Sequence, residues 1–250
     1  MNDQDISVRY EGLHPAQLIE RVLAENHGPA CITCSFQIEG MIVLHLLRRY
    51  LADIPVLFLD TGYHFAETYA YRDRMTKLWK LNLVNLTAQQ SVAEQEAQFG
   101  KLFRSDPGRC CHLRKVEPLM KGLEPYKLWF TGLRRQQSST RRGLKVLEHH
   151  RLPSGHELLK VNPLAAWDWE HVWNYAAEHG IESLPLYEEG YLSIGCQPCT
   201  AKPAPGADPR SGRWNGTKLE CGIHTISTRR CLTESETDTG IVFGPCQSFR

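Results

Sequence analysis

The sequence predicts an α/β protein in which a parallel sheet carries helices on both faces and is followed by a flexible C-terminal tail. Short apolar runs alternate with segments whose apolar residues recur at helical spacing, which is typical of βαβ units. The last sixty residues instead carry much glycine, proline and charge with weak periodicity. With 250 residues and 42% hydrophobic content, the chain can bury one substantial core.

The first element is a helix over 14–27, because Leu18, Ile19 and Val22 share one face and Pro15 stands in the first turn. A buried strand over 30–34 and a loop over 35–40 follow it. We expect further strands over 56–59, 81–86 and 126–131, and helices over 41–51, 65–80 and 167–179. This alternation implies right-handed crossovers between parallel strands.

Three segments fall at the carboxyl ends of the predicted strands, where open α/β sheets bind ligands. The loop 35–40 precedes a helix and favours an anion, but it lacks a Walker lysine and is equally compatible with an ordinary turn. The turn Asp60-Thr61-Gly62 is the second. The segment 131–142 holds four arginines and several hydroxyl donors, which favours phosphate or sulfate; a solvated basic loop is the alternative.

Nine cysteines follow an N-terminus without the basic start and apolar region of a secretory leader, so we expect a cytoplasmic protein with metal-binding or catalytic thiols. Cys110 and Cys111 are adjacent, and Cys196 and Cys199 form a Cys-x-x-Cys pair. Adjacent thiolates fit poorly on one tetrahedral zinc ion, whereas each can take a different corner of a 4Fe–4S cluster. The spacing therefore favours iron–sulfur over zinc.

Cys221 stands apart from that set and is followed by His224, an arrangement that suits a nucleophilic thiolate, although a free structural thiol is the alternative. A second Cys-x-x-Cys, Cys31 and Cys34, falls in a predicted buried strand, so we expect a structural role. Cys231 and Cys246 lie in the tail, where a regulatory disulfide has only composition in its favour.

The net charge of +1 gives no overall field for nucleic acid or membrane, and we expect neither as a partner. The longest apolar runs, 41–47 and 54–59, are too short to span a bilayer.

Several motifs together resemble the assimilatory adenylyl-sulfate reductases, the iron–sulfur branch of the phosphoadenylyl-sulfate reductase family. The resemblance runs from about Cys34 to His224. Its motifs are Leu59-Asp-Thr-Gly62, Cys110-Cys-His-Leu-Arg-Lys-Val116, Thr131-Gly132 with Arg134-Arg135, Asn162-Pro-Leu164, Cys196-x-x-Cys199 and Glu220-Cys-Gly-Ile-His224. The chain departs from the pattern at Gln37, where family members commonly carry glycine or serine.

The resemblance implies a fold like that of the ATP pyrophosphatases (adenine nucleotide alpha hydrolase-like). Residues 1–200 would form the nucleotide-binding domain with the 4Fe–4S site, and 201–250 a mobile segment with the catalytic Cys221. It implies attack of Cys221 on adenylyl sulfate, an S-sulfocysteine intermediate, and release of sulfite by thioredoxin or glutaredoxin, in a homo-oligomer.

The same resemblance suggests roles for individual residues. Lys115, Arg210 and Arg213 would line the sulfate end, with Arg134 and Arg141 as helpers. Ser35 and Glu39 would lie at the nucleotide loop and Leu59 near the adenine, while His224 would tune Cys221 or steady the tail. The cluster ligands would be Cys110, Cys111, Cys196 and Cys199, and the cluster would act structurally and electrostatically.

Three alternatives are weighed against this interpretation. A reductase of the 3′-phosphorylated substrate belongs to a branch that typically lacks the cluster cysteines; an enzyme of dual specificity is a variant of this alternative. An ATP-using sulfur-transfer enzyme needs a Ser-Gly-Gly-x-Asp-Ser loop, which 35–40 does not supply. An iron–sulfur sensor normally carries a DNA-reading element, and the sequence shows none.

Overall fold

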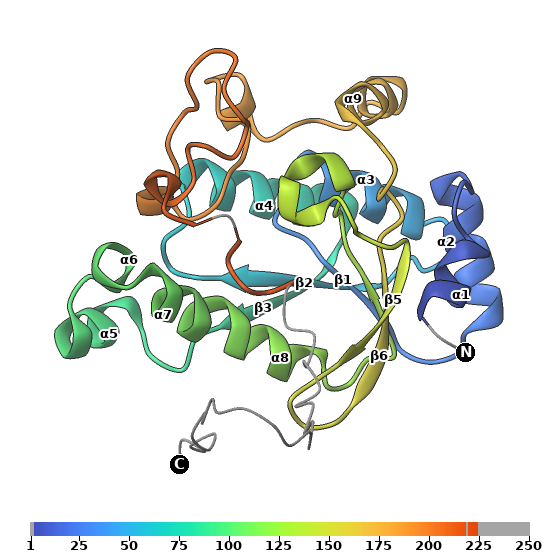
Figure 1. Ribbon diagram of the computed structural model, residues 1–250, viewed down its shortest axis with the longest axis horizontal. Coiled ribbons are helices and arrows are strands. Elements are labelled where there is room, and N and C mark those ends of the chain that lie inside the picture. Colours follow the sequence, from blue (N-terminus) through green and yellow to red (C-terminus); the bar gives the residue numbers. More distant parts are fainter. Residues whose placement is uncertain (1–2, 219, 225–250) are drawn as a thin grey trace, which may run out of the picture.

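The computed structural model describes residues 3–218 and 220–224, which build a six-stranded sheet with helices on both faces (Figure 1). The strand order is β3-β2-β1-β4-β6-β5. The strands are β1 (Ala30–Thr33), β2 (Pro55–Asp60), β3 (Asn82–Thr87), β4 (Leu128–Phe130), β5 (Leu147–Arg151) and β6 (Glu157–Val161). All neighbouring pairs run parallel except β5 and β6, so the predicted parallel sheet is confirmed apart from one edge strand.

The antiparallel edge formed by β5 and β6 is the part of the sheet that sequence analysis missed. Polar residues interrupt both strands: His149 and His150 in the first and Lys160 in the second. Gly155 makes the turn between them with a positive φ of 93°, a conformation that glycine adopts at no steric cost. Two short, polar strands give no apolar run to recognise, which explains why this hairpin was not predicted.

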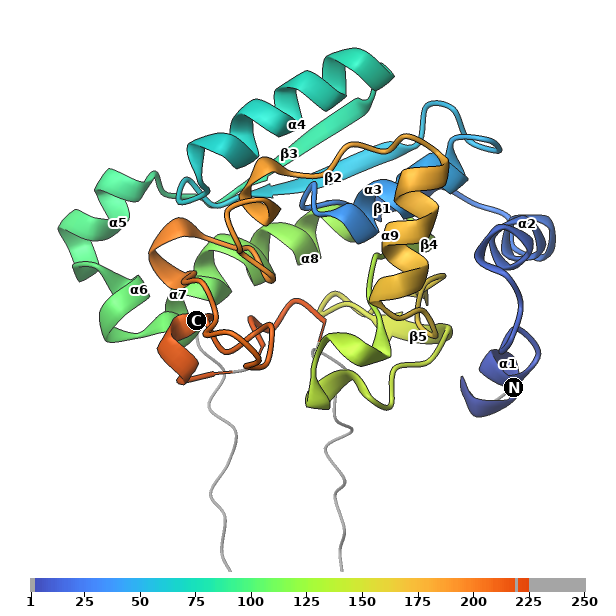
Figure 2. The same cartoon turned by 90° about the horizontal axis from the view of Figure 1, so that it is seen from above.

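Helices cover both faces of the sheet. In Figures 1 and 2, α3 and α4 lie on one face, and the chain of helices from α5 to α8 on the other. The bounds are α1 (Asp3–Val8), α2 (Pro15–Glu25), α3 (Ile38–Leu47), α4 (Ala66–Trp79), α5 (Val92–Phe99), α6 (Leu102–Ser105), α7 (Pro107–Cys111), α8 (Glu117–Leu123) and α9 (Trp169–Glu178). Across these described helices, none is both long and apolar enough to cross a membrane.

Helix α3 begins at Ile38 and ends at Leu47, whereas the sequence predicted a loop over 35–40 and a helix over 41–51. The expectation was wrong because α3 is apolar around almost its whole circumference, so periodicity gave no sign of where it starts. Phe36, with a φ of 59°, turns the chain from β1 into the helix. Glu39 therefore lies in the first helical turn, where the helix dipole favours a carboxylate.

Alternate residues of the central strands pack into two separate cores, as the period of a strand requires. Ile32 faces the core under α3 and α4, while Cys31 and Trp129 face the core under α8. Cys34 joins the first core, and burial raises the pKa of its thiol to about 12. Cys31 and Cys34 thus lie on opposite faces of the sheet, in agreement with a structural role for each.

Gly132 follows β4 at a point where two backbones approach closely. A Cβ at this residue would lie 2.8 Å from the backbone nitrogen of Gly40 in α3. We predict that Gly132→Ala lowers the free energy of unfolding by about 1–3 kcal/mol, because backbone must shift to admit the methyl group.

Gly143 supplies the matched control, since a Cβ there meets nothing within 4 Å. We expect Gly143→Ala to change the free energy of unfolding by less than about 0.5 kcal/mol. Urea unfolding of the two variants measures both values, and equal losses would contradict the close approach at Gly132.

Candidate active site

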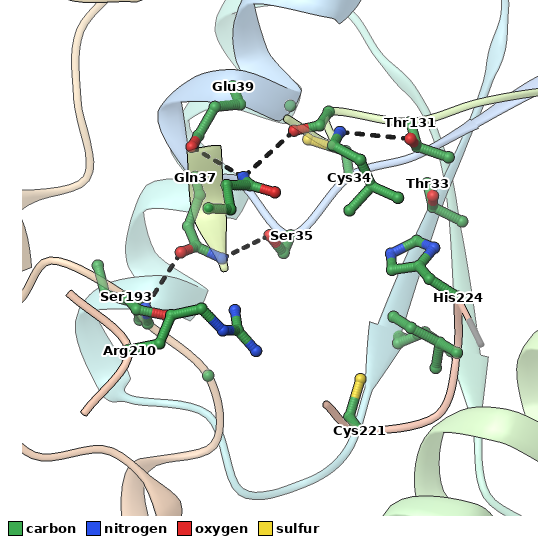
Figure 3. A pocket seen from close by; sticks show the side chains of 18 of the residues that line it. Thr33, Cys34, Ser35, Gln37, Glu39, Thr131, Ser193, Arg210, Cys221 and His224 are labelled. Carbon is green, nitrogen blue, oxygen red and sulfur yellow. Dashed lines mark hydrogen bonds between the residues drawn. The ribbon is translucent and has the colours of Figure 1, made fainter. Parts of the chain in front are cut away.

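A cavity opens at the carboxyl ends of β1, β2 and β4, and the close-up in Figure 3 looks into it. Ser35 and Gln37 lie on one side, Arg210 on another, and His224 and Cys221 face them across the hollow (Figure 3). Nine of the residues predicted for catalysis or substrate binding line this cavity: Ser35, Glu39, Leu59, Lys115, Arg141, Arg210, Arg213, Cys221 and His224. Residues far apart in the sequence are therefore brought to one place.

The loop before α3 is tied to a distant loop by Gln37. Its side-chain nitrogen donates to Ser35 Oγ at 2.9 Å, and its side-chain oxygen accepts from the backbone N–H of Ile194 at 3.1 Å. The segment 192–195 also lines the cavity, so Gln37 fixes one wall against another. The residue at which the chain departs from the family pattern thus has a bridging role in this structure.

Arg134 is the one predicted substrate-site residue that does not line the cavity. Its side chain is fully buried and forms an ion pair with Glu39, Nη2 to Oε1, at 3.0 Å. Gln137 donates to the same carboxylate oxygen at 3.0 Å, and the Arg134 guanidinium lies 4.3 Å from the centre of the Trp169 ring. Arg134 therefore holds Glu39 and Trp169, both of which line the cavity, from behind.

Three cations gather at the end of the cavity nearest Cys221. Lys115 and Arg213 are buried, with 9% and 5% exposure. Burial alone would lower the pKa of Lys115, but the thiols of Cys196, Cys221 and Cys111 outweigh it and raise that pKa. Burial and the nearby Arg141 lower the pKa of Arg210 to about 10, so this group also stays charged at neutral pH.

The four cysteines predicted as ligands line a second, smaller cavity next to the first. They are Cys110, Cys111, Cys196 and Cys199. Lys115 and Trp214 line both cavities and form the partition between them. In residues 3–218 and 220–224, no three His, Cys, Asp or Glu side chains are placed to hold a single metal ion.

The helix that carries Cys110 and Cys111 widens into a π-helical turn, His112–Val116, directly after them. Such turns are rare and occur frequently at functional sites. Arg114 from this turn donates to the Thr61 carbonyl at 2.5 Å and to the Gln95 side chain at 3.2 Å. The turn thereby anchors the cysteine pair to the loop after β2 while Lys115 reaches the partition.

The other cysteine pair is held by the same loop after β2. Thr61 Oγ1 lies 3.2 Å from Cys196 Sγ, and the Gln197 N–H donates to the Tyr63 carbonyl at 2.7 Å. Gly195 precedes the pair, and a Cβ there would lie 1.9 Å from Arg213 Nη2. Only glycine at this position lets the guanidinium pack against the backbone beside the thiols.

Cys221 lies in a short segment that is fixed at both ends. The His224 ring stacks on Trp129 at a centroid distance of 5.6 Å and an angle of 19°. Glu220, on the other side of Cys221, accepts hydrogen bonds from Arg141. Glu220 belongs to a motif named from the sequence, but no role was predicted for it.

His64 is a further cavity residue that sequence analysis missed. Its Nε2 lies 2.8 Å from the carbonyl oxygen of Leu59, and burial lowers its pKa to about 4, so the ring is neutral at physiological pH. Gln137 was also given no role, and Thr61, which belongs to a turn predicted to bind ligand, lines the second cavity instead of the first. For His64 the available signal was its position, two residues after the motif that ends at Gly62.

The buried Arg134–Glu39 pair generates a stability prediction. Arg134→Met leaves the Glu39 carboxylate without its charge partner, and we expect the free energy of unfolding to fall by about 3–5 kcal/mol. Arg135→Met is the control, since Arg135 pairs with Glu11 where both side chains are about a third exposed (31% and 42%). That loss should not exceed about 1 kcal/mol in urea unfolding. Similar losses in both variants would contradict the role assigned to Arg134.

Comparison with known proteins identifies relatives and similar structures for this chain. Residues 29–202 match the family model of the phosphoadenosine phosphosulfate reductase domain. The adenosine 5′-phosphosulfate reductase of Rhodococcus opacus is 50% identical over 77% of each chain. Crystalline phosphoadenylyl-sulfate reductase from Candida auris superposes with a TM-score of 0.67 at 25% identity, covering 79% of this chain and 95% of that one.

A more distant structure, the FMN adenylyltransferase of Candida glabrata, shares the fold with a TM-score of 0.55 at 15% identity, over 77% of this chain and 62% of that one. The mostly parallel sheet thus has the ATP-pyrophosphatase-like arrangement that the sequence predicted. Because the family model spans the strands, the cysteine pairs and most of the cavity, the chain belongs to the phosphoadenosine phosphosulfate reductase family.

Proposed function

We propose that this protein reduces adenylyl sulfate to sulfite and AMP in assimilatory sulfate reduction. The observation that carries the proposal is that Cys221 opens into the same cavity as the loop before α3, with Lys115, Arg210 and Arg213 beside it. A thiol, an anion-binding loop and buried cations are what attack on an activated sulfate requires. Relatives at this level of identity that are named for the same reaction support it.

The cavity offers complementary surfaces to the two ends of adenylyl sulfate. Leu59, near the end of β2, lines it on the side proposed for the adenine. Ser35 and the N-terminus of α3 face the phosphate with a hydroxyl and a helix dipole. The three cations then lie toward the sulfate, next to Cys221. This orientation places the sulfur of the substrate at the thiol.

In the first step, the Cys221 thiolate attacks the sulfur of the substrate. An S–S bond forms, the bond between sulfur and the bridging oxygen breaks, and AMP leaves with that electron pair. Lys115, Arg210 and Arg213 stabilise the charge that develops on the sulfate and phosphate oxygens. The product on the protein is an S-sulfocysteine.

In the second step, a dithiol donor such as thioredoxin or glutaredoxin attacks the sulfur of Cys221. Sulfite leaves and the donor closes its own disulfide, so the two electrons come from the donor thiols and Cys221 returns to the thiolate. The donor needs access to Cys221. We propose a nucleotide-binding part, 1–200, followed by a segment, 201–250, that carries Cys221; its residues 219 and 225–250, with Cys231 and Cys246, lie outside the described residues. We also propose a cytoplasmic homo-oligomer without nucleic-acid partners.

We further propose that Cys110, Cys111, Cys196 and Cys199 hold a 4Fe–4S cluster. Four thiols around one cavity, next to the cations Lys115 and Arg213, suit a centre that spreads its ligands over several iron atoms. When bound, such a cluster supplies fixed charge and cross-links α7 to the segment around Cys196. Thiol exchange already accounts for both electrons, so the proposed role is structural and electrostatic.

The test of the reaction is thioredoxin-dependent sulfite release from anaerobically purified protein. Adenylyl sulfate and its 3′-phosphate are compared at equal concentrations, because a similar solved structure is a phosphoadenylyl-sulfate reductase. We expect preference for adenylyl sulfate and a loss of at least about 1,000-fold in Cys221→Ser. Preference for the 3′-phosphate would move the assignment to that substrate, and sulfite from neither would end it.

The test of the cluster is iron content and visible absorbance. Cys196→Ser should lose most of both, since one of four ligands is removed. Cys31→Ser is the control, because Cys31 is also buried but lies in the core under α8, away from the second cavity. It should keep the iron of the unaltered protein. Iron that survives Cys196→Ser would show that the ligands are elsewhere.

A further inference from the structure

The carboxylate of Glu220, the residue before Cys221, is bound by four side chains. Arg141 donates from Nε at 2.9 Å and from Nη2 at 2.7 Å, one bond to each carboxylate oxygen. Thr140 Oγ1 donates at 2.9 Å and Ser138 Oγ at 3.1 Å. Arg210 Nη2 completes the set at 3.6 Å. We call this arrangement the Glu220 clamp.

In this arrangement the Arg141 guanidinium donates hydrogen bonds to side chains of the protein. Two of its nitrogens bind Glu220, and the third, Nη1, donates to Gln137 Oε1. Three of its five N–H donors are thus used within the protein, and the Nε–Nη2 side of the guanidinium is occupied while the clamp is closed. The resemblance to the family suggested it as a helper at the substrate, whereas the contacts here direct it to the Cys221 segment.

The clamp is electrostatically favourable although it is largely shielded from water. Glu220 and Arg141 each have 12% side-chain exposure. Burial alone would raise the pKa of Glu220, but the hydrogen bonds and charges of Arg141, together with Arg210, outweigh it and lower that pKa. A bidentate pair of this kind is stronger and more directional than an exposed one.

Cys221 is held between this clamp and a second anchor. On its far side, Ile223 packs against the core under α8 and His224 stacks on Trp129. Gly222, between Cys221 and Ile223, has a φ of 102°, which lets the chain turn sharply from one anchor to the other. Two fixed points this close in sequence restrict where the thiol between them lies.

From these contacts we propose that Glu220 is a positioning residue, which binds Arg141 and Arg210 to hold the Cys221 thiol over the cavity for attack. The role of Glu220 in catalysis rests on the proposed function, whereas the contacts of the Glu220 clamp do not depend on that function. Because the Glu220 carboxylate neutralises the charge of Arg141, the cations left for the substrate are Lys115, Arg213 and, in part, Arg210. Release of the clamp is then one route by which Cys221 becomes accessible to a protein thiol.

The first test measures alkylation of Cys221 by iodoacetamide without substrate, with the modified peptide identified by mass spectrometry. Glu220→Gln keeps the shape but removes the charge, and we expect Cys221 to react about tenfold faster. Glu25→Gln, which weakens the ion pair with Arg21 within α2, should leave the rate unchanged. An unchanged rate in Glu220→Gln would overturn the proposal.

The second test measures formation of S-sulfocysteine in a single turnover without thiol donor. We expect Glu220→Gln to lower the rate at saturating adenylyl sulfate about tenfold, with the half-saturating concentration changed less than about threefold. A raised half-saturating concentration with an unchanged saturated rate would overturn the proposal, since it would make Glu220 a determinant of binding. Failure of the unaltered protein to react at all concerns the proposed function and leaves the alkylation result valid.

If Glu220→Gln does not fold, Thr140→Val is the second variant for the alkylation test. It removes one neutral donor at the exposed edge of the clamp and leaves every charge in place. We expect Cys221 to be alkylated about threefold faster, in proportion to the loss of one hydrogen bond. No change in this variant would overturn the proposal in the same way.

Discussion

The arrangement of the site depends on two buried cations that lie among thiols. Lys115 and Arg213 interact electrostatically both with Cys221 and with thiols of the second cavity, and removing a cation from water is costly unless negative charge compensates it. The thiols on either side lie close enough to supply that charge when they are ionised, as they would be when they hold a metal centre. The nucleophile and the four cysteines are thus coupled through shared counter-charges, although they line different cavities.

Local backbone features bring these groups together. The π-helical turn after Cys111 directs Arg114 to the loop after β2 and Lys115 to the partition. Gly195 admits the Arg213 guanidinium against the chain, and the φ of Phe36 starts α3 where Glu39 enters its first turn. Each feature costs some local stability, and each places a charged group that longer-range packing alone would not fix.

Some cations at the edge of the sheet surround the space near Cys221, and others form ion pairs with carboxylates of the protein. Arg134 binds Glu39 and Arg141 binds Glu220, so part of the hydrogen-bonding capacity of each guanidinium is used within the protein. Lys115, Arg210 and Arg213 surround the space near Cys221. The number of arginines in the segment 131–142 therefore exceeds the number of cations available to a substrate, because buried carboxylates pair with some of them.

The sequence by itself determined the alternating strands and helices, the edge of the sheet where the cavity lies, and the separation of four cysteines from Cys221. These follow from periodicity and spacing, which are local properties. It did not determine the β5–β6 hairpin, the start of α3 or the partners of Arg134, Arg141 and Glu220. The hairpin is local in sequence, but its strands are short and polar, and α3 is apolar around almost its whole circumference, so periodicity marked neither. The partners of Arg134, Arg141 and Glu220 depend on residues some 80 to 95 positions apart meeting in space, as Glu39 and Arg134 do, and only tertiary packing decides such contacts.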